Sequence, residues 1–270
     1  MASLEGFVNA VNGILWNSVL LVGLLGIGVY CTISLGFPQL TRFWSAVKQV
    51  FGGVFKKEKT EEGSMSSFQA LATSIAAQIG TGNVAGVATA ISLGGPGAIF
   101  WMWVSAFFGM STIFVEATLA QKFRERDSDG QLVGGPAYYI KNGLGSKAMG
   151  AFFAVALILA LGFIGNMVQA NSIADAVSRA FNIPHIAIGI ALAIGAGLIF
   201  IGGIKRIASF AELVVPIMAL VYILGTIAVI IIFRANIGDV IRSIFVGAFN
   251  PQAIFGGAAG MTIARVIRYG

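Results

Sequence analysis

Long apolar segments separated by short charged segments constrain this chain more than any other feature of its sequence. An α-helix of about 20 apolar residues is long enough to cross the hydrocarbon core of a bilayer. Charged residues make up only 10% of the chain and its mean hydropathy is +0.88, values that exclude an ordinary soluble domain. The sequence therefore predicts an all-α, polytopic membrane protein in which residues 1–270 form a single transmembrane domain. The predicted spans cover residues 14–37, 66–94, 98–121, 148–175, 185–204 and 209–233.

The basic residues lie in the short segments between the apolar runs. Segments 42–63 and 122–147 each contain five Lys or Arg residues, and Lys205 and Arg206 separate the fifth and sixth runs. The segments on the other side contain three. The positive-inside rule then predicts an external N-terminus and cytoplasmic basic loops in a cell (inner) membrane. The net charge of +6 thus indicates orientation in a lipid bilayer and not nucleic-acid binding.

Two further features limit the function. No Lys or Arg precedes the first apolar run, so this run is interpreted as a retained span and not as a signal peptide. Cys31 and His185 are the only cysteine and histidine in the chain. One cysteine and one histidine are too few for a zinc cluster and give little support for Cys-His or Ser-His-Asp catalysis. We therefore expect neither an enzyme nor an organic cofactor. His185 is expected at an interface and Cys31 within a span.

The second apolar run contains an interruption, in the sequence IAAQIGTGNVAG at residues 75–86. A straight helix over residues 66–94 would reach roughly 43 Å at about 1.5 Å per residue, against a core of about 30 Å. A helix break at Gly80–Gly82 removes this excess, but backbone groups at such a depth must line a cavity or a site. The alternative is a pair of glycines that lets two helices pack closely.

A broken helix offers two kinds of ligand. Its first half ends in free carbonyls, which bind cations, and its second half begins with free amides, which bind anions. A zwitterion with a metal ion beside it would use both. Asn83 could add a side-chain oxygen, and Gln78 and Thr81 could supply hydrogen bonds. The same letters match a dinucleotide-binding fingerprint, but no strand precedes them and no acidic residue follows at the spacing required for a ribose.

Polar side chains also occur in three other spans. Asn166 and Gln169 lie on one helical face of the fourth span, where they either contact a substrate or bond to a neighbouring helix. Glu116 in the third span is either a structural partner or a proton carrier. Glu212 in the sixth span is expected to be a counter-charge for Lys205 and Arg206.

Four motifs carry a resemblance to a known family. They are GTGNVAGVATAISLGGPGAIFWMW from Gly80, FVEATLAQKFRE from Phe114, GGPAYYI from Gly134 and GNMVQANSIADA from Gly165. The chain resembles the alanine or glycine:cation symporter family of the amino acid-polyamine-cation superfamily, whose members share the LeuT-type fold. The resemblance implies sodium and amino-acid binding at Gly80, Thr81, Gly82 and Asn83, with Asn83 and Gly80 supplying the sodium ligands. It also implies substrate contact at Gln78 and Gln169.

The resemblance also implies a repeat organisation. Residues 14–37 would form an extra N-terminal span, residues 66–250 the first repeat of five spans, and residues 251–270 the start of a second, inverted repeat. Family members continue beyond this point, so the chain is expected to be either a fragment or a truncated product.

The implied function is sodium-coupled symport of a small neutral amino acid, alanine or glycine, by alternating access. A non-transporting membrane scaffold or subunit and a proton-coupled transporter are the alternatives. The oligomeric state is left open.

Overall fold

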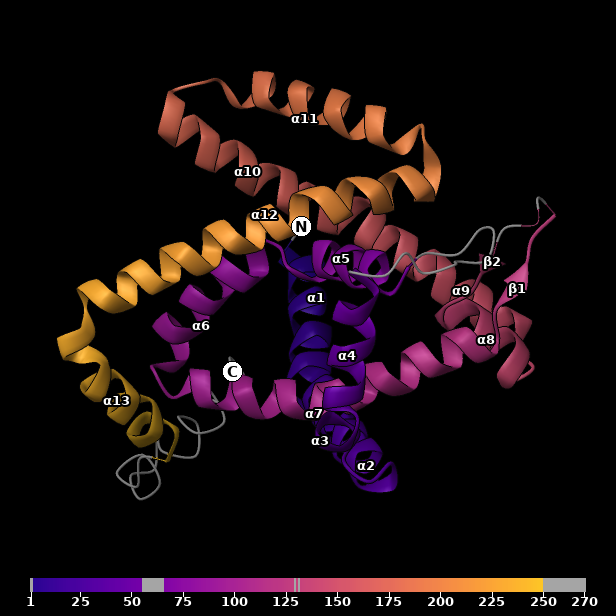
Figure 1. The fold of residues 1–270 in the computed structure, drawn as a ribbon, viewed down its shortest axis with the longest axis horizontal. Coiled ribbons are helices and arrows are strands. Elements are labelled where there is room, and N and C mark those ends of the chain that lie inside the picture. Colours follow the sequence, from indigo (N-terminus) through magenta and orange to yellow (C-terminus); the bar gives the residue numbers. More distant parts are fainter. Residues whose placement is uncertain (1, 55–65, 129, 131, 250–270) are drawn as a thin grey trace. The chain divides into compact units, whose positions relative to one another are not determined.

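Helices account for nearly all of the described structure, as expected for the apolar pattern. The structure is a computed structural model that describes residues 2–54, 66–128, 130 and 132–249 (Figure 1). The exception to the predicted all-α architecture is a small antiparallel hairpin of β1 (Glu125–Arg126) and β2 (Leu132–Val133). The predicted start of a second repeat, at residues 251–270, lies outside the described residues.

Three of the described helices are long and apolar enough to cross a membrane. They are α7 (Ala98–Lys122), the continuous helix Lys147–Phe181 and α12 (Gly203–Ile232). The second of these consists of α9 (Lys147–Leu157), a π-helical segment (Ile158–Gly165) and α10 (Asn166–Phe181). Shorter apolar helices at Val22–Ser34, Gly82–Gly94 and His185–Phe200 lie within the other three predicted spans. The helices thus support an integral membrane protein.

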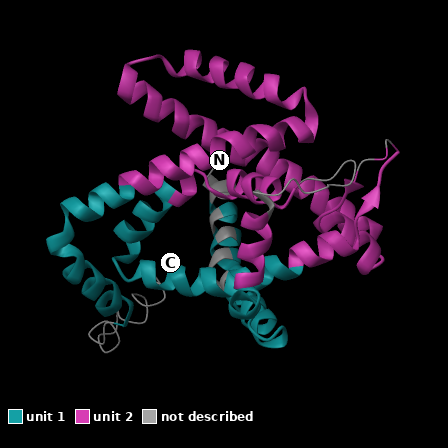
Figure 2. Ribbon diagram, viewed as in Figure 1, with its two compact units in different colours: residues 1–43, 84–115, 226–270 teal, residues 44–83, 116–225 magenta. Residues whose placement is uncertain are grey.

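The described residues form two compact units, shown in different colours in Figure 2. Unit 1 contains residues 1–43, 84–115 and 226–270, and unit 2 contains residues 44–83 and 116–225.

A buried polar network connects the N-terminal helices of unit 1 to α7. These helices are α1 (Ala2–Ile14), a π-helical segment (Leu15–Leu20), α2 (Leu21–Ser34) and α3 (Pro38–Thr41). The hydroxyl oxygens of Thr32 and Ser111, both fully buried, lie 2.7 Å apart. The Nε2 atom of Gln39 donates to Thr32 Oγ1 at 2.9 Å and to the carbonyl of Phe107 at 3.2 Å. Because buried polar groups are costly without partners, this network specifies how α2 packs on α7.

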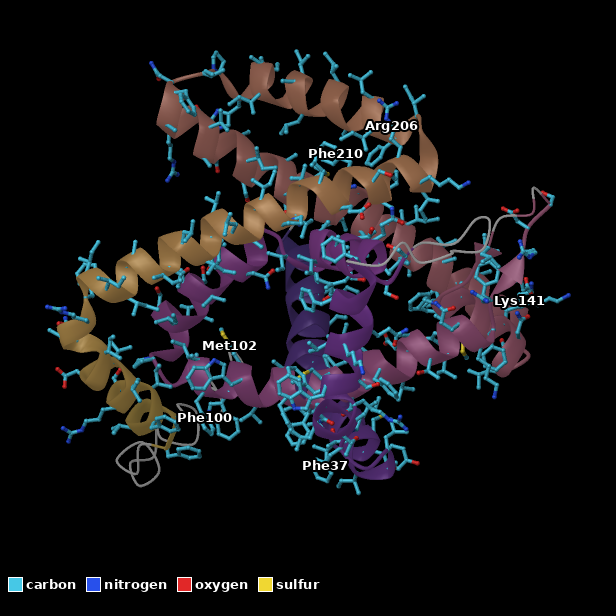
Figure 3. The ribbon with its side chains drawn as sticks, in the orientation of Figure 1. Phe37, Phe100, Met102, Lys141, Arg206 and Phe210 are labelled. Atoms are coloured by element: carbon cyan, nitrogen blue, oxygen red, sulfur yellow. The ribbon has the colours of Figure 1, made fainter. Side chains whose placement is uncertain are left out.

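Helix α13 (Ile237–Phe249) packs against the beginning of α7, also within unit 1. The ring of Phe100 lies 5.7 Å from that of Phe245 and 4.8 Å from that of Phe249, between centroids (Figure 3 labels Phe100). The backbones of Gly97 and Gly247 approach closely: a Cβ on Gly247 would lie 2.9 Å from the nitrogen of Gly97. These glycines bring α13 against the turn between α6 (Val87–Gly94) and α7.

Unit 2 contains α4 (Phe43–Val54) from Trp44 onward, α5 (Ser67–Gln78), α8 (Pro136–Gly143) and α11 (His185–Phe200). Helix α8 is the short helix that Gly134-Gly135-Pro136 introduces, and it packs on α9. Helices α10 and α11 form an antiparallel hairpin whose turn starts at Asn182, which has a left-handed backbone (φ 55°). His185 binds Asp175 across this hairpin at 2.8 Å, with both side chains exposed.

The structure corrects two predicted boundaries. Lys205 and Arg206 were expected between the fifth and sixth spans, but α12 begins at Gly203 and includes both (Figure 3 labels Arg206). Gly203 has φ +66°, so the chain turns there and not at the basic pair. The basic segment predicted as a loop over residues 42–63 contains helix α4, and its residues 55–65 lie outside the described part.

Candidate functional site

The second predicted span is broken in the structure. Helix α5 ends at Gln78, and Ile79 has an extended backbone with φ −90° and ψ 107°. Gly80 is also non-helical, after which a π-helical segment (Gly82–Gly86) leads into α6. The predicted break is therefore present, and it begins one residue earlier than the predicted Gly80–Gly82. A regular helix does not run through residues 78–84.

Gly80 and Asn83 satisfy each other's polar groups at the break. The N–H of Gly80 donates to Asn83 Oδ1 at 3.1 Å, and the N–H of Asn83 donates to the carbonyl of Gly80 at 3.1 Å. Both oxygens that the sequence suggested as cation ligands thus lie in one turn. Each accepts one hydrogen bond here, and an amide or carbonyl oxygen has a second lone pair that can face a cation.

Gln169 of α10 meets the break. Its Oε1 atom accepts a hydrogen bond from the N–H of Thr81 at 3.4 Å. A Cβ on Gly80 would lie 2.9 Å from Gln169 Oε1, closer than real Cβ atoms come, so the carboxamide at the end of this side chain would have to shift. Glycine at position 80 therefore makes room for this carboxamide. The structure thus brings Gln169, which the sequence proposed from another span, to Gly80, Thr81 and Asn83.

Other predicted site residues lie at the edge of this group or away from it. Gln78 is exposed in the last turn of α5, and Gly82 is the first residue of the π-helical segment, with open space where a Cβ would be. Asn166 is not brought to the break: its Nδ2 atom donates to the carbonyl of Gly162 in its own helix at 3.0 Å. Asn166 and Gln169 thus share a helical face but make different contacts.

Glu212 and Glu116 lie beside partners that the sequence did not identify. Glu212 was expected to neutralise Lys205 and Arg206, but the ion pairs in the described part are Lys141–Glu125 and His185–Asp175. Glu212 Oε2 instead accepts a hydrogen bond from Gln69 Nε2 at 2.8 Å, a partner that the sequence did not suggest. Glu116 lies near α8, where burial of Tyr139, together with the charge of Glu116, raises the pKa of Tyr139.

The ligand types at the break suit a monovalent cation better than a transition metal. Among the described residues, no three His, Cys, Asp or Glu side chains gather into a metal-binding group. The break instead presents neutral oxygens from a backbone carbonyl and two carboxamides, beside free helix ends. Interrupted membrane helices use such carbonyl ends for sodium or protons and the amide ends for anionic substrate groups.

Comparison with known proteins identifies the family of the chain. The model of the sodium:alanine symporter family matches residues 1–270. A sodium/alanine symporter, AgcS, of Methanococcus maripaludis is 46% identical over 97% of this chain and 58% of its own length. A putative sodium/proton-dependent alanine carrier, YrbD, of Bacillus subtilis is 43% identical over 98% of this chain and 53% of its own. A probable sodium/glutamine symporter, GlnT, of the same species is 40% identical over 99% and 55%.

The chain spans little more than half the length of these relatives. The family model nevertheless covers all of its residues, and the helix break lies within the matched region. On this evidence, the chain belongs to the sodium:alanine symporter family.

Proposed function

We propose that the protein is a symporter that couples inward movement of sodium to uptake of a small neutral amino acid, alanine or glycine, by alternating access. The observation that carries this proposal is the broken helix at Ile79–Gly80, with the carboxamide of Gln169 bound at the break. A structural helix has no need of such an interruption, because an unbroken helix satisfies its own backbone at no cost in lipid.

The residues at the break divide the proposed work between two ligands. The carbonyl of Gly80 and Oδ1 of Asn83 would bind sodium, which prefers oxygen ligands. The N–H of Thr81, at the start of the second half-helix, would bind the carboxylate of the amino acid in place of Gln169 Oε1, and Gln78 and the released carboxamide of Gln169 would add hydrogen bonds. Gly82 has no side chain that would cover the backbone, so the ligand could approach it there. Asn166 would contact the substrate only after its hydrogen bond to the carbonyl of Gly162 breaks.

The relatives support the choice of ligands through their names, which include sodium, alanine and, in one case, glutamine. The LeuT-type inverted repeat, with residues 14–37 as an extra span and 66–250 as the first repeat, is part of the proposal. The same holds for the inner membrane as location, with an external N-terminus and cytoplasmic basic loops.

The membrane potential can drive such uptake. Moving one net positive charge inward yields about 2.3 kcal/mol per 100 mV. This corresponds to roughly 40-fold accumulation of a neutral amino acid, before any sodium gradient is added.

The test is uptake of radiolabelled alanine into proteoliposomes that contain the protein expressed from its complete gene. An inward sodium gradient should drive accumulation, while a choline gradient of equal ionic strength should not. Gln169→Leu keeps the side-chain size but removes both hydrogen-bonding atoms, so it should reduce uptake at least about tenfold. Absence of uptake under every gradient would favour the membrane scaffold.

Proton coupling is the second candidate, because the name of one relative includes both sodium and protons. In this case uptake would persist when choline replaces sodium, would follow an imposed pH gradient and would be lost in Glu116→Gln. Under the sodium proposal, Glu116→Gln retains sodium-driven uptake.

A further inference from the structure

The first turn of α5 is attached to α12 by a polar contact that lies well away from the break. The carboxamide of Gln69 uses both of its ends: Oε1 accepts from the N–H of Ser66 at 3.2 Å, and Nε2 donates to Glu212 Oε2 at 2.8 Å. Ser66 Oγ in turn accepts from the N–H of Gln69 at 3.1 Å, which completes a capping box. The cap of α5 and its attachment to α12 are therefore one connected set of hydrogen bonds.

Small apolar side chains form the rest of this contact. Ala72 of α5 is 2% exposed and packs with Ala211 and Val215 of α12, each 5% exposed, with Ile75 beside them. Alanine side chains allow close approach but interlock little with a neighbour. The hydrogen bond to Glu212 is thus the directional element of the contact.

The position of α5 on α12 determines where its other end lies. Helix α5 extends over 12 residues, about 18 Å at 1.5 Å per residue, and it ends at the extended residue Ile79. The carbonyl of Gly80 follows directly. Because the chain is non-helical at Ile79–Gly80, the following helix does not fix the direction of α5, and residues with such backbones are suited to act as hinges.

We propose that Glu212 is a positioning residue for the site at the break, acting through Gln69 and α5. It holds α5 against α12 and so places the carbonyl end of α5 beside Gln169 and Thr81. This inference rests on the proposed function for the identity of the ligands, sodium and alanine. The attachment of α5 to α12 through Gln69 and Glu212 does not depend on that function.

Exchange of the two partners provides the sharpest test. Gln69→Glu keeps the capping box but places two carboxylates against each other, so α5 should separate from α12. Glu212→Gln keeps an oxygen that can accept from Gln69 and should have a mild effect. The double variant Q69E/E212Q restores the hydrogen bond in the opposite direction, because the carboxamide introduced on α12 can donate to the carboxylate introduced on α5.

The position of α5 can be measured without any transport assay. In a Cys31→Ala background, Ala72→Cys introduces a thiol in the buried contact, which a maleimide reaches only when α5 leaves α12. Its labelling rate should rise at least about fivefold with Q69E and return to the starting value with Q69E/E212Q. Ala70→Cys, on the exposed side of the same helix, is the matched control and should label equally in all backgrounds.

The effect on the site is measured as sodium-dependent binding of radiolabelled alanine. Q69E should weaken binding at least about tenfold, and Q69E/E212Q should restore it to within about threefold of the unmodified protein. The variant K205A/R206A should bind normally, since Glu212 acts through Gln69 and not as a counter-charge.

Three results would overturn the inference: no change in labelling with Q69E, no rescue by the double variant, or equal loss of binding in K205A/R206A. If the unmodified protein binds no alanine in sodium, the proposed function fails instead. The labelling of Ala72→Cys then still decides whether Gln69 and Glu212 hold α5 in place.

Discussion

At the break after α5, the carboxamide of Gln169 fits against the backbone of Gly80 because Gly80 has no side chain. The space that a Cβ would occupy at position 80 is filled by Gln169, whose Oε1 atom accepts the N–H of Thr81. One residue thus lacks a side chain so that another can reach the backbone. This explains in physical terms why a glycine stands at the point of closest approach, beyond any need to interrupt a helix.

The first prediction follows at the residue scale. Gly80→Ala should displace the carboxamide of Gln169 and weaken sodium-dependent alanine binding at least about tenfold, since a hydrogen bond and its geometry are lost together. Gly86→Ala is the matched control, because a Cβ at Gly86 meets nothing within 4 Å. Equilibrium binding of radiolabelled alanine measures both variants. Equal binding by Gly80→Ala and the unmodified protein would contradict this account of the site.

The second prediction concerns Glu125 in the hairpin of unit 2. Lys141 donates to its carboxylate at 3.1 Å and Asn142 at 2.7 Å, and these hydrogen bonds lower the pKa of Glu125 below its usual 4.5. A carboxylate with a depressed pKa stabilises the fold above its unfolded pKa, and this contribution is lost as the pH falls through the lower, folded value. The attachment of β1 to α8 should therefore weaken below about pH 4.5.

A nitroxide at Ser128, after β1, reports this change by electron paramagnetic resonance. Its mobility should rise as the pH is lowered below 4.5. With Glu125→Gln, the nitroxide should be mobile at every pH and should no longer respond to acid. A pH response that persists in Glu125→Gln would assign the effect to another group.

At the scale of elements, the interruptions of the helices have separable roles. The break at Ile79–Gly80 exposes backbone groups, whereas the π-helical segment Ile158–Gly165 continues without a gap into α10, which carries Gln169. Helix α13 is different again, because its position depends on two glycines that let backbones touch. The position of a helix can thus depend on the absence of a Cβ atom at a contact as well as on the side chains that pack there.

The third prediction tests the placement of α13. Gly247→Ala adds a Cβ that would lie 2.9 Å from the nitrogen and 3.3 Å from the Cα of Gly97, and backbone atoms cannot move aside as a side chain can. Overpacking of this kind costs about 1–3 kcal/mol. The Tm of the purified protein in detergent should fall by several degrees. Gly238→Ala, at the start of the same helix with no atom within 4 Å of its Cβ, should leave the Tm unchanged or raise it.

At the scale of the whole molecule, the fourth prediction concerns the orientation in the membrane, which follows from the distribution of Lys and Arg residues. If the basic loops are cytoplasmic, a thiol at Ser128 between β1 and β2 and a thiol at Ala180 near the end of α10 lie on opposite sides of the membrane. In a Cys31→Ala background, an impermeant maleimide should label Ala180→Cys in right-side-out vesicles and Ser128→Cys in inverted ones. The reverse pattern would invert the proposed topology, and labelling of both from one side would remove the span between them.

Sequence reasoning succeeded where a property belongs to one segment. The apolar runs, the break near Gly80 and the family all follow from local composition, spacing or motif. Helix α13 was missed although its pattern was available, since apolar residues recur at Ile237, Val240, Ile241, Ile244 and Phe245, at helical spacing. The error at Lys205 and Arg206 arose because charge was taken to mark a loop, whereas Gly203 makes the turn.

The sequence by itself determined that this protein is helical, lies in a membrane and breaks its second span, because hydrophobicity and backbone freedom act over neighbouring residues. Only the tertiary structure decided that Gln169 and not Asn166 reaches the break, and that Glu212 bonds to Gln69 and not to the nearby basic pair. These partners are far apart in the chain. Which helical faces meet depends on the packing of whole elements, and the hydrogen bonds between them form only after that packing is set.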